Sequence, residues 1–508
     1  MAKDTIDVES SADQVEQPSP ETEELLVGRA PEIAEQSKPD YTRVFLKLYA
    51  VVFLINLGFQ VLGPAQVQIL ERIYCNEWYD KHPTDRVTFQ SQIPESLCKI
   101  PQVQQQLSTL KGWAEFFGAA PALIVSIPVG KLTDIYGRRI FGIATLTSLF
   151  LAQLWTMAIM WFEGAVPLKA IWLSSIFSFF GGGSAGAELI LVCVLTDIST
   201  AEGLTVAFFR VTSMGYFGKV IGPIIAATLM RFDPWLAIYT GLAFILATCL
   251  LMFSIPETLP SRVMLESHDS ERDGQEWTQP RTLRSKIPKF SWKDTRESLR
   301  DVMKIWSDYR LIFVALTYPF RVVCYALGDL TQRYVSDRYH WTLADATLVY
   351  AIQAAAAAIM LFTLLPMISH QIDKRCSWSI IQKNVVLSRA SLLTLVFAYA
   401  VIGLAPTAPI MIIGLLIETL ATGFPATTRA LASALVEGAD KGSVFAVLAV
   451  VETLSAMVAF PISAAFFNLG LAKGGGAWLG LPYDSISVVA AIAFLAMCLV
   501  RFERRIRV

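Results

Sequence analysis

Residues 130–139 read GKLTDIYGRR and interrupt a long apolar region of the chain. The two glycines of this run permit a tight turn and a close approach of the flanking segments. The aspartate can accept hydrogen bonds at a helix start, and the two arginines favour the cytosolic side of a membrane. The run therefore predicts a cytosolic turn between two membrane helices. Its five informative residues are Gly130, Asp134, Gly137, Arg138 and Arg139.

Apolar runs of about 20 residues continue on both sides of this turn, and that length spans the hydrocarbon core of a bilayer as a helix. The first six runs lie near residues 43–66, 107–129, 140–162, 168–195, 203–230 and 234–255. The second six lie near residues 310–332, 344–368, 384–404, 407–434, 443–469 and 484–502. The predicted fold class is an all-α membrane protein with twelve transmembrane helices in two bundles of six.

Composition agrees with a membrane environment. Of the 508 residues, 54% are hydrophobic and 17% are charged, and the mean hydropathy is +0.49. A soluble domain has about a quarter of its residues charged. The formal net charge of -1 argues against a nucleic-acid partner, because neutralising phosphates needs a clustered basic excess.

Five regions are expected along the chain. They are an acidic disordered tail (1–42), a first helix bundle (43–255), a linker with a basic segment (256–308), a second bundle (309–502) and a basic tail (503–508). Lysine and arginine collect in the turns on one side, which places both tails and the linker in the cytosol. The basic segment either lies on the membrane surface as an amphipathic helix or is a solvated loop.

Two cysteines, Cys75 and Cys98, share the one long connection on the outer side, residues 67–106. A disulfide there would tether the connection by on the order of 3 kcal/mol. Two free thiols explain the sequence equally well, so both alternatives stay open. The remaining cysteines show no metal-ligand spacing, and we predict no metal site and no cofactor.

GKLTDIYGRR resembles the signature loop of the major facilitator superfamily, G-x-x-x-D-R-x-G-R-R or K, in a chain whose six-plus-six layout also matches. The resemblance implies two pseudo-symmetric bundles and a loop that acts as a conformational latch without touching substrate. The sequence departs from the family pattern at Ile135, where an arginine is usual. That departure leaves Asp134 to pair with another group, for which Arg138 is our candidate.

The predicted fifth helix contains the run MGYFGKVIGPIIA, in which Gly218 and Gly222 are four residues apart and Pro223 follows. Small residues at this spacing let a neighbouring helix approach closely, and the proline bends the axis. The run resembles a glycine-proline motif that the family associates with antiporters and exporters. Simple close packing explains it equally well.

Ionisable residues within the predicted spans each cost roughly 2.5 to 3.5 kcal/mol at mid-membrane unless they are paired or hydrated. Glu188 and Arg210 lie at similar depth and could pair, and we favour a structural salt bridge over a gating role. By resemblance, the first, fourth, seventh and tenth helices line the solute path. Glu418 is our first candidate for taking up and releasing a proton and Glu452 the second, and a static pair with Arg321 or Lys219 is an equal alternative for each. The candidate residues for coupling or cavity charge are Glu188, Lys219, Arg321, Glu418 and Glu452.

These features predict a transporter that works by alternating access, with a small organic solute, a proton and membrane lipid as partners. Proton-coupled efflux of a toxic or secondary metabolite is our leading hypothesis. Proton-coupled uptake of a nutrient or vitamin and a non-transporting nutrient sensor are the alternatives. The sequence looks most like fungal members, and we expect a monomer in the cell membrane, or alternatively in a vacuolar or endosomal membrane.

An enzyme is not expected. The run GGSAG at residues 182–186 matches the G-x-S-x-G motif of serine hydrolases, but it lies inside an apolar span. The four histidines of the chain fall in predicted loops, so Ser184 has no predicted base.

Overall fold

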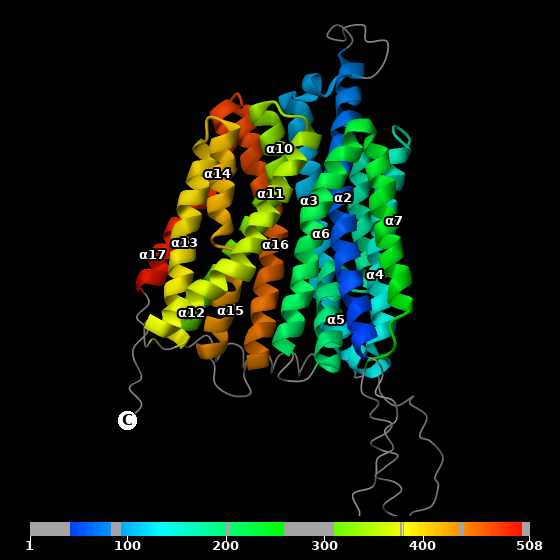
Figure 1. The fold of residues 1–508 in the computed structure, drawn as a ribbon. Coiled ribbons are helices and arrows are strands. Elements are labelled where there is room, and N and C mark those ends of the chain that lie inside the picture. The colour runs from blue at the N-terminus through cyan, green and yellow to red at the C-terminus, as the bar shows by residue number, and fades with distance from the viewer. Residues whose placement is uncertain are drawn as a thin grey trace, which may run out of the picture. The chain divides into compact units, whose positions relative to one another are not determined.

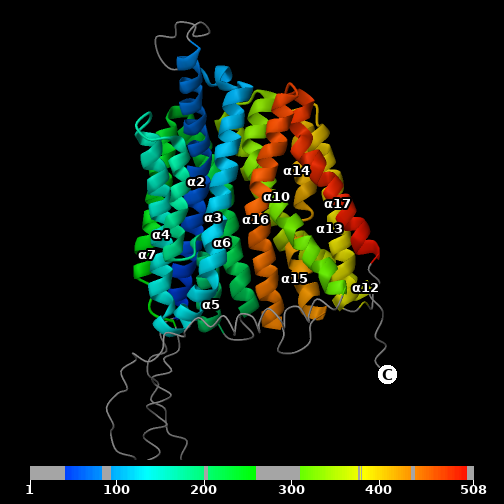
Figure 2. The ribbon, with the colours of Figure 1, turned by 180° about the vertical axis from the view of Figure 1, so that it is seen from behind.

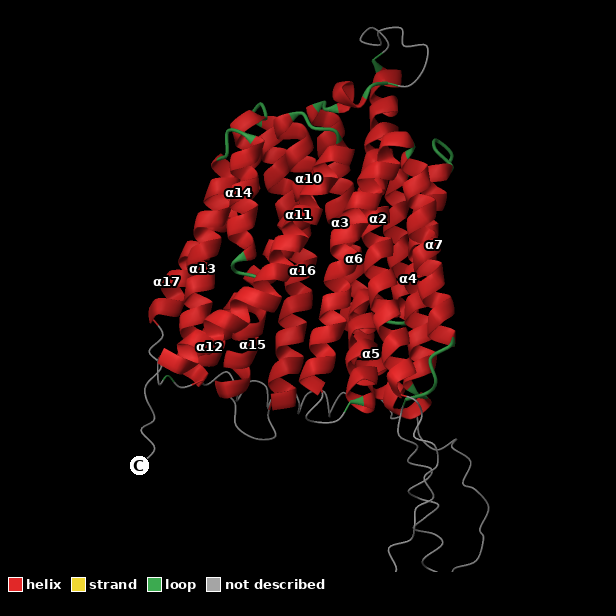
Figure 3. Cartoon of the chain, in the orientation of Figure 1, coloured by secondary structure: helices red, strands yellow, loops and turns green. Residues whose placement is uncertain are grey.

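A computed structural model describes residues 41–82, 93–199, 204–258, 309–375, 378, 380–435 and 441–499. Two units are distinguished, residues 1–45 and 46–508, and every contact given below lies within the second. All regular elements of the described residues are helices (Figure 3). The predicted tails and almost all of the predicted linker lie outside the described residues.

The first half of the chain supplies the helices that correspond to the first six predicted spans. They are α2 (Tyr41–Lys81), α3 (Pro101–Tyr136), α4 (Arg138–Trp161), the 3-10 helix η2 (Leu168–Phe180) with α5 (Gly183–Ile198), α6 (Leu204–Phe232) and α7 (Pro234–Phe253). A short 3-10 helix, η1 (Glu95–Cys98), precedes α3.

The second half supplies a helix for each of the other six spans. They are α10 (Tyr309–Tyr339), α11 (Leu343–Ile359) continued by the π-helix η3 (Met360–Leu364) and α12 (Leu365–Arg375), α13 (Ile380–Leu404), α14 (Ala408–Thr419) with α15 (Phe424–Leu435), α16 (Lys441–Ala472), and the 3-10 helix η5 (Gly476–Gly480) with α17 (Leu481–Leu499). Figure 1 and Figure 2 show these helices from two sides.

The predicted outer loop at residues 67–106 is wrong at its beginning, because α2 continues as a helix to Lys81. Apolar side chains of this extension, such as Ile69 and Ile73, are buried in the core of the first half. Of the three acidic residues in this extension, Glu71 is 2% exposed and is paired with Lys99. A charged residue that has a partner inside the protein is compatible with a buried helix. A hydropathy profile counts only its polarity, and so predicted a loop in water here.

Two of the predicted spans are broken. The fourth changes from η2 to α5 at three glycines, where Gly182 adopts a left-handed φ of 80°. The tenth stops at Thr419 and resumes at Phe424, with a turn at residues 420–423. Irregular backbone at membrane depth is tolerated only where it is buried in protein or lines a cavity, so each break marks an internal position.

Ten of the described helical segments are long and apolar enough to cross a membrane. The helices α3 and α10 are distinguished by the charges that they carry. Both helices carry ionisable side chains in the part that would cross, including Lys111 and Glu115 on α3 and Asp329 and Arg333 on α10. Such helices are stable in a bilayer only if the charges face protein or water rather than lipid.

The two halves meet along two helix pairs, α3 with α16 and α6 with α11. The first pair is close, because a Cβ atom added at Gly112 would lie 3.0 Å from the Cβ of Ala464. Nearer the outer end, Asn468 Nδ2 donates to Thr109 Oγ1 at 3.0 Å. We use "outer end" for the end at which α2 stops and α3 begins, following the orientation predicted from the basic residues.

Candidate functional site

Glu418 lies in the last turn of α14, just before the break in the tenth span. It is about ten residues, or roughly 15 Å, from the start of that helix. The carboxylate accepts hydrogen bonds from Tyr399 Oη on α13, at 2.9 Å, and from Gln353 Nε2 on α11, at 3.2 Å. Tyr399 is fully buried and is also hydrogen-bonded to Cys324 on α10. Four helices of the second half therefore position this one carboxylate.

Neutral donors, rather than cations, hold Glu418. None of the ion pairs between described side chains involves Glu418. The side chain of Arg321 is outside this described set. A tyrosine hydroxyl can donate to a carboxylate or accept from a carboxylic acid, so the site accommodates both protonation states without leaving a cation unpaired. The sequence predicted Glu418 and missed its two donors. The sequence gives only a weak indication of Tyr399 and Gln353, because each is a single polar residue in an apolar helix.

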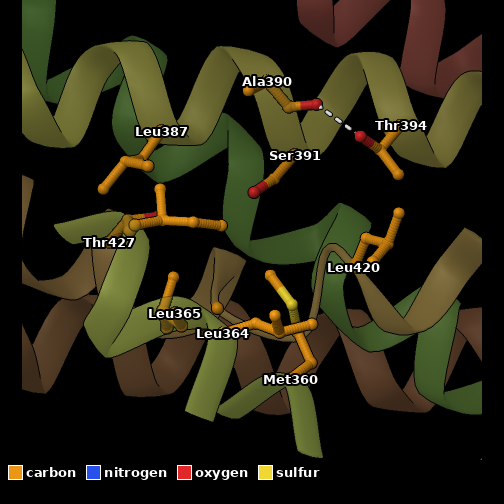
Figure 4. Close-up of a pocket in the computed structure, with 11 residues that line it drawn as sticks. Met360, Leu364, Leu365, Leu387, Ala390, Ser391, Thr394, Leu420 and Thr427 are labelled. Atoms are coloured by element: carbon orange, nitrogen blue, oxygen red, sulfur yellow. Dashed lines mark hydrogen bonds between the residues drawn. The ribbon is translucent and has the colours of Figure 1, made fainter. Parts of the chain in front are cut away.

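An apolar pocket of about 250 Å³ borders the break that follows Glu418. Figure 4 shows α13 side chains on one side of it and side chains from η3, α12 and the break on the other, with the Ser391 hydroxyl directed inward. Both irregular segments of the second half contribute to its wall, because Met360 and Leu364 lie in η3 and Leu420 lies in the break. The pocket suits an apolar group, and the serine and two threonines supply a few polar contacts.

The predicted glycine-proline motif lies on the face of α6 that packs against α2. A Cβ atom added at Gly218 would lie 2.9 Å from the Asn56 Cβ and from the Phe53 carbonyl oxygen. One added at Gly222 would lie 2.5 Å from the Gln60 Cβ. The helix continues through Pro223 to Phe232. Both glycines are therefore at positions of close helix packing.

The predicted latch is built around Gly137, which separates α3 from α4. Its φ of 103° favours glycine, and a side chain there would overlap the Glu257 carboxylate. That carboxylate accepts from the backbone N–H groups of Arg138, at 2.7 Å, and Arg139, at 3.1 Å. Glu257 thus satisfies the first amides of α4 and places a negative charge at its N-terminus. The sequence did not predict this role.

The arginine side chains of the latch bind within the first half. Arg138 Nε lies 3.2 Å from Asp197 Oδ2 at the end of α5, and Arg139 Nη2 donates to the Phe253 carbonyl at 2.6 Å. These contacts tie α4 to α5 and α7. The predicted pairing of Arg138 with Asp134 lies outside the described side chains, and so do the surroundings of Gly130. Asp197 was not predicted as a partner.

A family model described as Major Facilitator Superfamily matches residues 48–459, a range that runs from α2 into α16 and contains the predicted latch. The chain belongs to the major facilitator superfamily.

Fungal transporters are similar to this superfamily member along most of their length. An MFS-type transporter of Aspergillus flavus, aprT, is 26% identical over 477 residues, which cover 91% of this chain and 89% of the relative. A protein of Emericella nidulans named as an MFS efflux pump, atnC, is 25% identical over 461 residues, covering 88% and 86%. An efflux pump of Aspergillus flavus, ustT, is 22% identical over 466 residues, covering 89% of each chain.

Solved transporter structures share the fold. The nucleoside transporter NupG superposes with a TM-score of 0.58 at 13% identity, covering 90% of this chain and 100% of the other. A D-xylose-proton symporter superposes with a TM-score of 0.57 at 13% identity, covering 89% and 96%. The predicted all-α membrane fold with two six-helix bundles is thereby confirmed.

The other charges predicted for the spans of this superfamily member are not gathered at Glu418. Glu188 and Arg210 are both exposed, and the predicted ion pair between them is wrong, because no described pair within 4.0 Å joins them. Lys219 is exposed as a residue, and its ammonium lies 5.4 Å from the centre of the Tyr216 ring. The side chain of Arg321 lies outside the described set.

Glu452 lies 3.9 Å from Arg429 Nη2, between α16 and α15. The static pair considered for this residue therefore exists, but with a different cation from the two considered, Lys219 and Arg321. The side chains of this pair are about a third to a half exposed, so the interaction is weak.

A second group of charges joins the two halves of the transporter at α3 and α10. Asp329 Oδ1 lies 3.4 Å from Lys111 Nζ, and Asp329 Oδ2 lies 2.9 Å from Arg333 Nη2. Glu115, one turn from Lys111, is within electrostatic range of all three. One turn beyond Arg333 toward the outer end comes Asp337, which faces Lys99. We call these residues the outer charge row: Lys99, Asp337, Arg333, Asp329, Lys111 and Glu115.

A disulfide joins Cys75 of α2 to Cys98 of η1, with the Cα atoms 5.3 Å apart. It fixes the segment 93–100 beside α2. Lys99 of this segment binds Glu71 Oε1 at 2.7 Å, and Glu95 Oε1 accepts from the backbone N–H of Leu343 at 2.6 Å. Burial opposes the charged form of Lys99, but the carboxylates around it, Glu71 above all, keep its pKa above the usual range. Lys99 is therefore the cation that pairs with Glu71.

Proposed function

We propose that this transporter exports a small, moderately hydrophobic organic molecule, a toxic or secondary metabolite, in exchange for protons. Glu418 carries the proton, and the apolar pocket beside it accepts part of the solute. Efflux is supported by the names of two relatives, atnC and ustT, and by the glycine-proline run of α6.

The observation that carries this proposal is the environment of Glu418. A carboxyl group held by neutral donors at membrane depth can gain or lose a proton as its exposure to water changes, without breaking an ion pair. The neighbouring break in the backbone lets the α14–α15 span change shape at the same place. Proton binding and solute binding are thus linked through one structural element.

The first test compares metabolites inside cells and in the medium, with and without the protein, each with and without a protonophore. Export predicts a compound that leaves the cells only when the protein is present and the gradient is intact. Accumulation inside under the same conditions would support uptake of a nutrient or vitamin. No difference in any compound, with the protein correctly placed in the membrane, would support a sensor.

The residue assignment is tested in the same cells. Glu418→Gln keeps the shape and the neutral donors but removes the titratable group, so gradient-dependent export should stop. The matched control is Glu163→Gln, because Glu163 is an exposed carboxylate in the turn after α4.

We place the protein in the cell membrane as a monomer. Fluorescence microscopy of a tagged chain separates this location from a vacuolar or endosomal one.

A further inference from the structure

Asp337, in the last turn of α10, is an acidic side chain that the proposed coupling at Glu418 does not use. Both of its carboxyl oxygens are buried and have no hydrogen-bond partner among the described residues. An ionised carboxylate in such a position loses its hydration without compensation, which costs several kcal/mol. Asp337 is therefore stable here as the neutral acid rather than as the carboxylate.

The charged groups that face Asp337 come from three elements. They are Arg333 on its own helix, Glu71 on α2, and Glu95 and Lys99 in the disulfide-bound segment 93–100. Both cations are already bound to other carboxylates: Lys99 to Glu71, at 2.7 Å, and Arg333 to Asp329, at 2.9 Å. An ionised Asp337 would therefore be a carboxylate without a cation of its own.

The same neighbours hold the outer end closed. Glu95 caps the first turn of α11 through the Leu343 N–H, at 2.6 Å, and so links the first half to the second. Lys99 fixes the position of that segment through Glu71 and also lies 3.5 Å from Glu95. We call the Glu95–Leu343 and Lys99–Glu71 contacts the outer gate. Any state of the transporter that opens outward must break the first of them.

We propose that Asp337 is a proton-binding site of the outer gate, in addition to the coupling site at Glu418, and that the gate closes with Asp337 protonated. Loss of the proton makes Asp337 compete with Glu71 and Glu95 for Lys99. It also attracts Arg333, which has two further buried N–H groups, Nε and Nη1, without partners. Both effects weaken the contacts that hold segment 93–100 over α10 and α11.

The sign of the pH dependence follows from this preference. Because the closed gate binds one more proton than the open gate, raising the pH at the outer side favours opening. The equilibrium shifts by up to tenfold per pH unit, which is the limit for one proton. The inference rests on alternating access but not on the identity of the solute.

Amide hydrogen exchange of the purified full chain in nanodiscs tests the proposal. The readout is the protection of the peptide that contains Leu343, from about pH 5 to about pH 9, after correction for the intrinsic exchange rate at each pH. In the unmodified chain, protection should fall as the pH rises. In Asp337→Asn, which is always neutral, it should stay at the low-pH level throughout.

Two controls keep this outcome separate from other effects. Asp233→Asn changes an exposed outer carboxylate that caps α7, and asparagine caps equally well, so this variant should follow the unmodified chain. Glu418→Gln should still show protection that falls as the pH rises, whatever its absolute level, which separates the gate from the coupling site even if the proposed export is wrong. A flat profile in the unmodified chain, or the same pH dependence in Asp337→Asn, would overturn the proposal.

Discussion

Glu418 and Asp329 are both acidic residues at membrane depth in the second half, but their surroundings differ. Glu418 accepts from two neutral side chains, whereas Asp329 binds two cations and joins the two halves. A proton added to Glu418 removes no ion pair. A proton added to Asp329 would break its ion pairs with Lys111 and Arg333. The first residue is therefore suited to coupling, and the second to holding a conformation.

The largest expected effect comes from Asp329→Ala. Arg333 is 4% exposed, and removing its carboxylate leaves a buried charge unpaired, which costs about 3–5 kcal/mol. We expect strongly reduced thermal stability, measured by a fluorescence melting assay in detergent. Glu418→Gln should change the same free energy of unfolding by less than about 1 kcal/mol. Equal destabilisation by the two substitutions would contradict the distinction between the sites.

A smaller effect is expected at the contact between α6 and α2. Gly222→Ala places a Cβ atom 2.5 Å from the Gln60 Cβ, so the helices must separate slightly, at a cost of about 1–3 kcal/mol. The matched control is Gly63→Ala in α2, where no atom lies within 4 Å of the added Cβ. Melting temperatures of the two variants should differ clearly. If Gly63→Ala lowers stability as much, close packing is not the reason for the glycine at position 222.

The smallest effect is expected for the exposed ion pair at the outer end. Arg231 Nη2 lies 2.6 Å from Asp345 Oδ1, but the side chains are 59% and 42% exposed. Such pairs contribute about 0–1 kcal/mol and are screened by salt. Arg231→Gln should therefore leave stability and export almost unchanged, at low and high salt alike. A loss of export comparable to that of Glu418→Gln would assign this exposed pair to the mechanism as well.

Hydropathy predicted the twelve spans because the length of a membrane helix is set by the bilayer. Hydropathy failed where a segment is surrounded by other parts of the protein instead of by lipid or water. The extension of α2 to Lys81 contains Glu71, whose partner Lys99 is 28 residues away, so the polarity of this segment resembles that of a loop. The breaks at residues 181–183 and 420–423 depend on packing against other helices, which a single segment does not reveal.

Site residues were predictable only where one residue type is unusual by itself. Glu418 was found because a carboxylate within an apolar helix is costly, but Tyr399 and Gln353 are common in membrane helices. Asp197 and Glu257 bind the latch from positions 59 and 119 residues away from Arg138. The outer charge row was missed as a group because its members come from α3, α10 and the segment before α3, and only the fold brings them together.

The most direct test of the central claim uses proteoliposomes and the solute identified by the metabolite comparison, with the unmodified chain and Glu418→Gln. Two rates are measured: uphill transport driven by an imposed pH gradient, and exchange of labelled for unlabelled solute without a gradient. If Glu418 carries the coupling proton, Glu418→Gln loses gradient-driven transport by at least about tenfold but keeps exchange within about twofold. Gradient-driven transport at the unmodified rate would contradict this role for Glu418.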